Sequence, residues 1–140
     1  MVVLLVAALL TSSEPSVWLA GLVEQAQASP SADETPDQKA TKEMVVGRAY
    51  SARHNDTGAI NRFKIVITEY RTSQYVEEAL ARLAQSYETL GINQEAQTAV
   101  AVLERQFPNG QWTRDARDAL KALGLTPAED ERSWISKAFK

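Results

Sequence analysis

Acid–base or nucleophilic chemistry in this chain would have to use very few residues. The only histidine is His54, which is followed directly by Asn55 and Asp56, residue types that favour a turn. A hydrolytic triad needs a nucleophile and an oriented base, and no G-x-S-x-G motif accompanies this histidine. We therefore expect His54 to occupy a solvent-exposed turn rather than a catalytic site.

Carboxylates gather at two places, Glu77-Glu78 and Glu129-Asp130-Glu131. Neighbouring side chains on a helix diverge by about 100°, so the first pair does not converge on one substrate atom. Both clusters are expected in the first turns of helices, where negative charge interacts favourably with the helix dipole. The chain has no cysteine, no metal-ligand spacing and no phosphate-binding glycine loop. These patterns predict a binding protein without catalytic residues, metal or cofactor.

The side chains best suited to binding are the arginines in the middle of the chain. Arginine is favoured at protein interfaces because its planar guanidinium pairs bidentately with carboxylates and stacks on aromatic rings. Most of these arginines are expected to lie on a solvated helix face, and one or two to contact a partner. They are Arg48, Arg53, Arg62, Arg71 and Arg82.

The charge of the chain argues against nucleic acid as a partner, because the formal net charge is −3 at pH 7. The charge is also unevenly distributed. Residues 1–36 contain four acidic residues and no lysine or arginine, and all 15 basic residues follow them. The polar, proline-bearing stretch around 29–37 is typical of a linker. We predict an apolar N-terminal segment and a linker over residues 1–36, and a folded part from residue 37.

The apolar run Val2–Leu10 is too short to span a bilayer, which takes about 20 residues. It has the length of the apolar region of a signal peptide, and Ala26-Gln27-Ala28 has the form of a cleavage site. No basic residue precedes the run, so a misassigned gene start and a short helix lying against the domain stay as alternatives. Because cysteine is absent from the sequence, no lipid attached through a cysteine is expected.

The stretch QYVEEALARL at residues 74–83 returns 37 residues later as QWTRDARDAL at 111–120. Around it, the L-G-x-x-Y and A-x-x-x-F skeleton of a tetratricopeptide repeat occurs twice. Small residues at the expected helix crossings let antiparallel helices approach closely, and aromatic residues fill the space beside them. The small residues are Gly47, Ala59, Ala84 and Ala96, and the aromatic ones are Tyr50, Phe63 and Tyr87.

These patterns predict an all-α solenoid of tetratricopeptide-like helical hairpins over residues 37–125, about two and a half repeats long. Each hairpin leaves an apolar face that its neighbour covers. Thr72 or Ser73, and then Asn109, are the expected caps of the helices that follow them, and Pro108 ends the second hairpin. The expected helices cover residues 38–53, 57–70, 74–90, 93–106 and 112–123.

Residues 126–140 are predicted to form a C-terminal amphipathic helix. Thr126 and Glu129 have the spacing of a capping box, and Pro127 would occupy the first helical position. The helix is expected to run from Pro127 to Phe139, and its apolar face to carry Trp134, Ile135, Ala138 and Phe139.

The apolar face of this last helix has two candidate uses. It would cap the open end of the solenoid by covering Trp112, Leu120 and Leu123, which would otherwise face water on a terminal repeat. The alternative is peripheral contact with a membrane surface, since basic residues flank the face. We expect the cap.

Several runs go beyond the repeat skeleton and resemble the C-terminal repeats of the BamD family, the outer membrane protein assembly factors. The similarity covers roughly residues 37–140, and the tail Ser133-Trp134-Ile135-Ser136 resembles the ending of alphaproteobacterial members. The other runs that carry it are Gly47-Arg48-x-Tyr50, Ala59-Ile60-Asn61-Arg62-Phe63, Val76-Glu77-Glu78-Ala79-Leu80, Glu95-Ala96, and Phe107-Pro108 followed by Gln111-Trp112.

This resemblance implies a subunit on the periplasmic side of the outer membrane, in the complex that inserts β-barrel proteins. In the family, the C-terminal repeats hold the POTRA region of the barrel subunit BamA, and other assembly subunits join the complex. The arginine of an Asn-Arg pair belongs to that contact. Here the pair is Asn61-Arg62, and Arg53 at the end of the preceding helix is its expected neighbour.

Two functions therefore stand side by side. The first is a non-catalytic scaffold of outer-membrane protein assembly, which docks through residues 38–70. The second is a generic tetratricopeptide-type envelope adaptor that binds a peptide or protein on its concave face. An enzyme is the least favoured, because no set of catalytic residues can be named for it.

Overall fold

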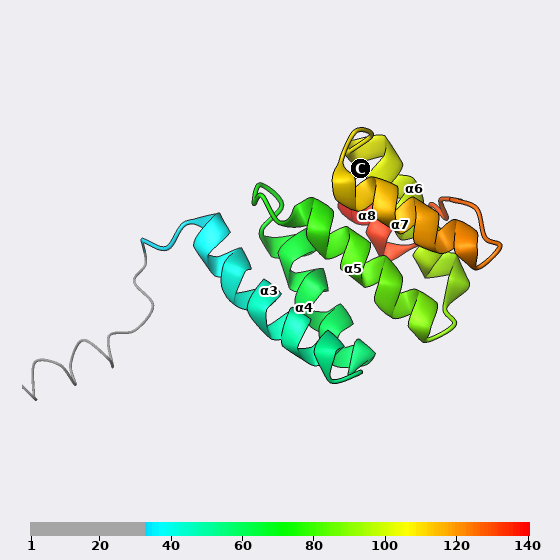
Figure 1. Ribbon diagram of the computed structural model, residues 1–140. Helices are drawn as coiled ribbons and strands as arrows, with labels where there is room; N and C mark the ends of the chain where they lie inside the picture. The colour runs from blue at the N-terminus through cyan, green and yellow to red at the C-terminus, as the bar shows by residue number, and fades with distance from the viewer. Residues whose placement is uncertain (1–32) are drawn as a thin grey trace, which may run out of the picture. The chain divides into compact units, whose positions relative to one another are not determined.

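The computed structural model describes residues 33–140, and Thr35–Lys140 form one compact helical unit (Figure 1). The predicted apolar segment, its candidate cleavage site and residues 29–32 of the predicted linker lie outside the described residues. Within residues 33–140 there are six helices and no strand. The predicted all-α fold of packed helical hairpins is confirmed.

The first hairpin consists of α3 (Pro36–Ala52) and α4 (Asp56–Glu69). A capping box starts α3, in which the Thr35 hydroxyl accepts from the Gln38 backbone and the Gln38 side chain accepts from the Thr35 backbone. His54 forms the turn with a positive φ of 57°, and it is exposed, as predicted. Asn55 then caps α4 by accepting a hydrogen bond from the Gly58 backbone at 2.9 Å.

Gly47 lies where α3 and α4 pack most closely. A Cβ atom at this position would lie 2.5 Å from the ring of Phe63, inside van der Waals contact. Phe63 is itself fully buried in the core. The small residue and the aromatic ring therefore fit together as the sequence predicted.

The second hairpin consists of α5 (Val76–Thr89) and α6 (Asn93–Gln106), and α7 (Gln111–Ala122) follows it. The central helix is α5, which packs against α4, α6 and α7. Ala84 and Ala96 are buried, in agreement with the predicted register.

The predicted caps of α5 and α7 were wrong. No side chain caps α5, and Asn109 does not cap α7, whose N-cap is Gly110. Instead Glu77 reaches from α5 and accepts hydrogen bonds from the Thr113 backbone and hydroxyl at 3.1 and 3.2 Å. A Cβ on Gly110 would overlap the Glu77 carboxylate, so a side chain there would displace this contact. A neighbouring helix thus supplies the hydrogen-bond acceptor that a local residue was expected to supply.

The C-terminal segment also differs from its prediction. Its helix, α8, covers only Trp134–Ala138, and Ser133 caps it. Residues 125–130 are not helical, and the Thr126–Glu129 capping box does not form. The physical reason is that α6 satisfies the backbone of this segment. Gln97 donates to the Thr126 carbonyl at 2.9 Å, and the Thr98 hydroxyl accepts from the Asp130 backbone at 3.1 Å.

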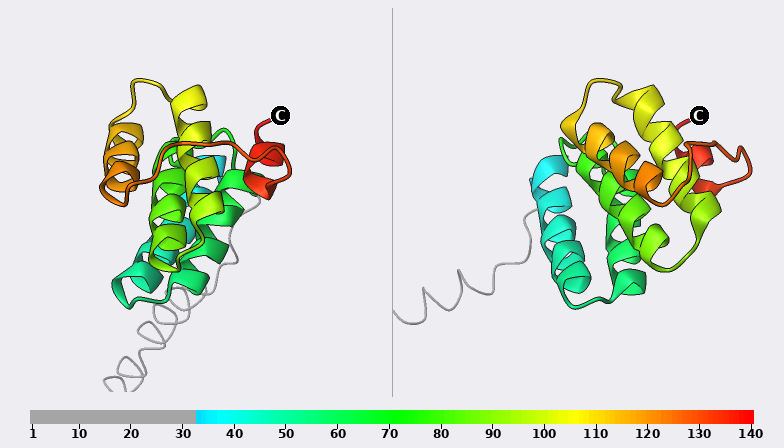
Figure 2. Two further views of the ribbon diagram at one scale, coloured as in Figure 1. Left: turned by 90° about the vertical axis from the view of Figure 1, so that its right-hand side faces the viewer. Right: turned by 45° about the vertical axis from the view of Figure 1, so that its right-hand side comes forward.

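The short helix α8 packs against α6, and Figure 2 shows α7 and α8 on opposite sides of the α5–α6 pair. The C-terminal helix was predicted to cover Trp112, Leu120 and Leu123. That was wrong for Trp112 and Leu123, which are 37% and 57% exposed, whereas Leu120 is fully buried. The apolar side chains of α8 are used inside the fold. Ile135 is fully buried, and the Trp134 indole donates to the Tyr87 hydroxyl at 3.1 Å.

Candidate protein-binding site on the first hairpin

Arg62 lies on α4 and is bound across the hairpin to α3. Its Nη1 atom is 3.1 Å from Oε2 of Glu43, and the two side chains are 39% and 21% exposed. The hydrogen bond to Glu43 raises the pKa of the Arg62 guanidinium, which is therefore fully charged. One contact of this kind leaves most of the five N–H donors of the guanidinium for other groups. The side chain is thus held in place and still accessible.

The other two predicted binding residues lie on the same hairpin. Asn61 is exposed on α4, next to Arg62. Arg53 is the C-cap residue of α3, and its exposed side chain has no hydrogen bond or ion pair with the rest of residues 33–140. Arg53 is thus at the turn, whereas Arg62 lies about 9 Å further along the axis of α4. The fold places the three residues on one hairpin without joining them directly.

Three of the five arginines singled out in the sequence form contacts between elements of the fold. Arg71 donates to the carbonyl of Ala138, and its guanidinium lies 5.9 Å from the ring centre of Phe139. Arg48 and Arg82 both bind the Glu78 carboxylate. Of the other two, Arg62 has one ion pair, to Glu43, and the Arg53 side chain has none within residues 33–140.

The cluster around Glu78 was missed in the sequence, where this residue was expected only to favour the dipole of α5. Arg48 binds it bidentately, at 2.8 Å from Nε and 2.6 Å from Nη2, and Arg82 Nε binds it at 2.6 Å. Burial alone would raise the pKa of Glu78, but the hydrogen bonds from the two arginines outweigh it and lower the pKa. The one available signal was an acidic residue among core positions of an amphipathic helix.

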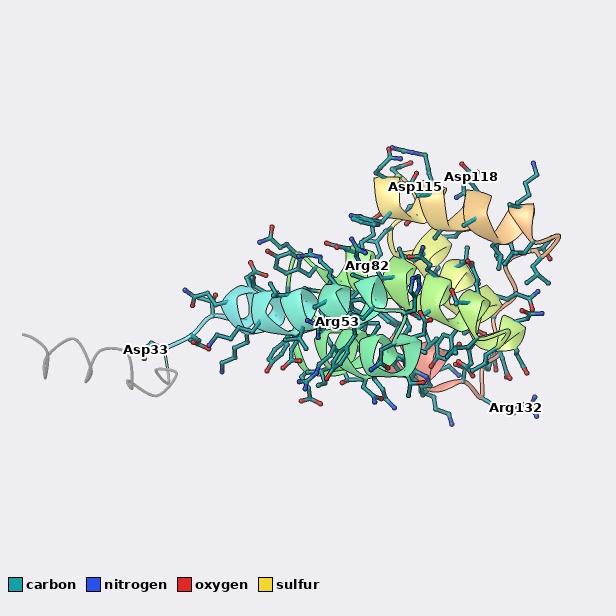
Figure 3. All side chains as sticks on the ribbon, turned by 60° about the horizontal axis from the view of Figure 1, so that its bottom comes forward. Asp33, Arg53, Arg82, Asp115, Asp118 and Arg132 are labelled. Carbon is teal, nitrogen blue, oxygen red and sulfur yellow. The ribbon has the colours of Figure 1, made fainter. Side chains whose placement is uncertain are left out.

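The same two arginines stack on aromatic rings and connect three helices. Arg48 on α3 lies 5.8 Å from the ring centre of Tyr75, and Arg82 on α5 lies 5.1 Å from that of Trp112 on α7. Figure 3 shows Arg82 at the boundary between α5 and α7, with Asp115 and Asp118 on α7. The cluster therefore fixes the first helices of successive hairpins to one another.

No group of three or more histidine, cysteine, aspartate or glutamate side chains within residues 33–140 is placed to hold a metal ion. None of the helices in this part of the chain has the length and apolar content that crossing a bilayer requires.

Antiparallel helix pairs with small residues at their crossings define a tetratricopeptide-like repeat protein. The chain belongs to the YfiO family of outer membrane lipoproteins, whose family model matches residues 33–103.

Three relatives show the extent of this similarity, and each is named outer membrane protein assembly factor BamD. The chain is 44% identical to the protein of Caulobacter vibrioides over 96 residues, which are 69% of this chain and 32% of the relative. It is 45% identical to that of Rickettsia prowazekii over 76 residues, 54% of this chain and 30% of the relative. It is 39% identical to that of Neisseria meningitidis serogroup A over 74 residues, which are 53% of this chain and 28% of the relative.

The chain thus spans about a third of the length of the curated relatives that it matches. No solved structure matches it significantly.

Proposed function

We propose that this chain is a non-catalytic scaffold in outer-membrane protein assembly, on the periplasmic side of the outer membrane. In this proposal the first hairpin docks on the POTRA region of the barrel subunit BamA, within a complex that includes other assembly subunits. Membership of the YfiO family and the name shared by the relatives support the assembly role. The docking role rests on the geometry of the first hairpin.

The observation that carries the proposal is that the Arg62 side chain is both anchored and exposed. Its guanidinium is anchored to Glu43 at 3.1 Å, yet 39% of the side chain is exposed. An anchored side chain loses less conformational entropy on binding than a free one, so it is well suited to contact a carboxylate of a partner. Exposed Asn61 and Arg53 on the same hairpin add a polar group and a second positive charge.

The test is the binding of purified cognate POTRA domains to the full chain and to an Arg62→Ala variant. Loss of a central arginine contact is expected to weaken binding by about 1–3 kcal/mol, or roughly fivefold to 150-fold. Arg117→Ala is the matched control, because Arg117 also pairs with a glutamate across two helices and is 42% exposed. Equal binding by both variants would contradict docking through Arg62.

Folding and binding effects can be separated in these variants. An exposed ion pair contributes about 0–1 kcal/mol to stability, so both arginine variants should melt close to the unmodified chain. A generic envelope adaptor is the second candidate function. A pull-down from envelope extracts distinguishes it, because an adaptor would recover peptide or soluble partners and no barrel-assembly subunit.

A further inference from the structure

A second surface with binding character lies between α5 and α7, on different helices from the first hairpin. It is a pocket of about 240 Å³. Ala81, Ala116 and Ala119 contribute small side chains to its lining, and Trp112, Glu88 and Asp115 contribute the larger ones. Pockets for drug-sized ligands are typically about 300–1,000 Å³, so this one has room for a single side chain of a partner.

Glu88 is the feature of the pocket that the fold itself does not explain. Its Oε1 atom is buried and has no hydrogen-bond partner in the part of the chain that the structure describes. Burial raises the pKa of this carboxyl above its ordinary value. Glu78, near the start of the same helix, is buried but binds two arginines. A carboxylate left without such partners destabilises the fold unless something else compensates it.

The position of Glu88 on its helix destabilises the unpaired carboxylate further. It lies in the last turn of α5, and that turn contains no basic residue. The C-terminal end of a helix carries partial negative charge from its unpaired carbonyl groups. The carboxylate and the helix end therefore repel each other, and both would be stabilised by a cation at this place.

The opposite wall of the pocket already holds one cation. Trp112 is 37% exposed at the start of α7, and the Arg82 guanidinium lies 5.1 Å from its ring centre. Asp115 follows three residues later and so lies on the same side of α7. Arg82 is the one basic residue in the lining, and its Nε is already bonded to Glu78 at 2.6 Å. The unpaired charge of the pocket is therefore negative.

We propose that the pocket between α5 and α7 binds a basic side chain of a partner polypeptide, with arginine preferred to lysine. The guanidinium pairs with the Glu88 carboxylate and is flanked by Asp115. Arginine is preferred because its planar fork presents several N–H donors to these carboxylates. This site does not depend on the proposed docking through Arg62, and either can fail without the other.

The experiment uses the full chain, observed by NMR at the Trp112 indole N–H and the Gln85 side-chain amide. The probes are capped pentapeptides with one arginine, lysine, leucine or glutamate between alanines, added into the millimolar range. The arginine peptide is expected to shift both signals saturably, the lysine peptide more weakly, and the leucine and glutamate peptides not at all.

A pair of matched variants tests the role of the carboxylate. Glu88→Gln keeps the shape of the side chain and removes its charge, and it should weaken binding of the arginine peptide about tenfold. Glu131→Gln removes an exposed carboxylate outside the pocket and should bind as the unmodified chain does. Three results would each overturn the proposal: no shift with the arginine peptide, an equal shift with the leucine peptide, or unchanged binding by Glu88→Gln.

Discussion

Arg48 on α3 and Glu78 on α5 are thirty residues apart in the chain and form a bidentate ion pair, with bonds of 2.8 and 2.6 Å. Arg82 binds the same carboxylate from the next turn of α5. The ion pair thus joins the first hairpin to the second by a polar contact in addition to apolar packing. A contact between successive hairpins matters in a repeat protein, because each repeat is stabilised mainly by its neighbours.

Removal of the Glu78 charge should therefore destabilise the chain. We expect Glu78→Gln to lower the free energy of unfolding by about 1–3 kcal/mol. The value is below that of a fully buried pair because the two arginine side chains are 37% and 27% exposed and keep contact with water. Urea denaturation at neutral pH measures it, with Glu131→Gln as an exposed control. A loss no greater than that of the control would mean that the cluster adds nothing to stability.

The contribution of Glu78 should also depend on pH. Its folded-state pKa is below the ordinary value of 4.5, so the stabilisation is present in full well above pH 4.5 and is lost as the pH falls through the folded-state pKa. The stability difference between the unmodified chain and Glu78→Gln should therefore be constant near neutral pH and shrink below pH 4.5. Denaturation curves across this acid range provide the measurement. A constant difference at every pH would contradict the lowered pKa.

Glu88 should show the opposite pH dependence. Burial raises its folded-state pKa above 4.5, so its ionisation costs stability as the pH rises from 4.5 through the raised value. We expect Glu88→Gln to be more stable than the unmodified chain at neutral pH and equal to it in acid. Thermal melts of both proteins at neutral pH and below pH 4.5 measure this difference. A variant that is less stable at neutral pH would show that the carboxylate has a partner in the fold.

Ala96 tests the register of the second hairpin. It is fully buried where α6 packs against its neighbours. Ala96→Leu should cost about 1–3 kcal/mol, because the larger side chain must displace its surroundings. Ala101→Leu, at a half-buried position of the same helix, is the matched control and should cost less. Equal melting temperatures for the two variants would contradict the packing described for α6.

The C-terminal segment offers a direct comparison of two apolar residues. Ile135 is fully buried, whereas Leu123 is 57% exposed. Ile135→Ala should cost about 2–4 kcal/mol, and Leu123→Ala less than about 0.5 kcal/mol. Chemical denaturation of the two variants measures both values. The reverse order would restore the original expectation that α8 covers the end of α7.

The repeat architecture could be predicted from the sequence because its signals are local. The echo of residues 74–83 at 111–120, and small residues such as Gly47 and Ala96, report helix periodicity and close helix packing. The helices α3 to α7 accordingly begin and end within about two residues of the predicted bounds, the ordinary uncertainty of a helix end. Arg53, Asn61 and Arg62 could be placed on one hairpin for the same reason.

The tertiary structure alone decided which polar groups meet. Thr126 and Glu129 satisfy the local rule for a helix start, yet the segment stays extended because α6 offers its backbone better-placed hydrogen bonds. Glu77 and Glu78 are neighbours in one helical turn, but one caps α7 and the other binds two arginines. Arg48 and Thr113 are 30 and 36 residues away from these glutamates on other helices, whereas Arg82 lies in the next turn of α5. Local propensities contain no information about which distant donor will satisfy a buried carboxylate. That the buried Glu88 Oε1 atom lacks a hydrogen-bond partner could therefore be recognised only from the tertiary structure.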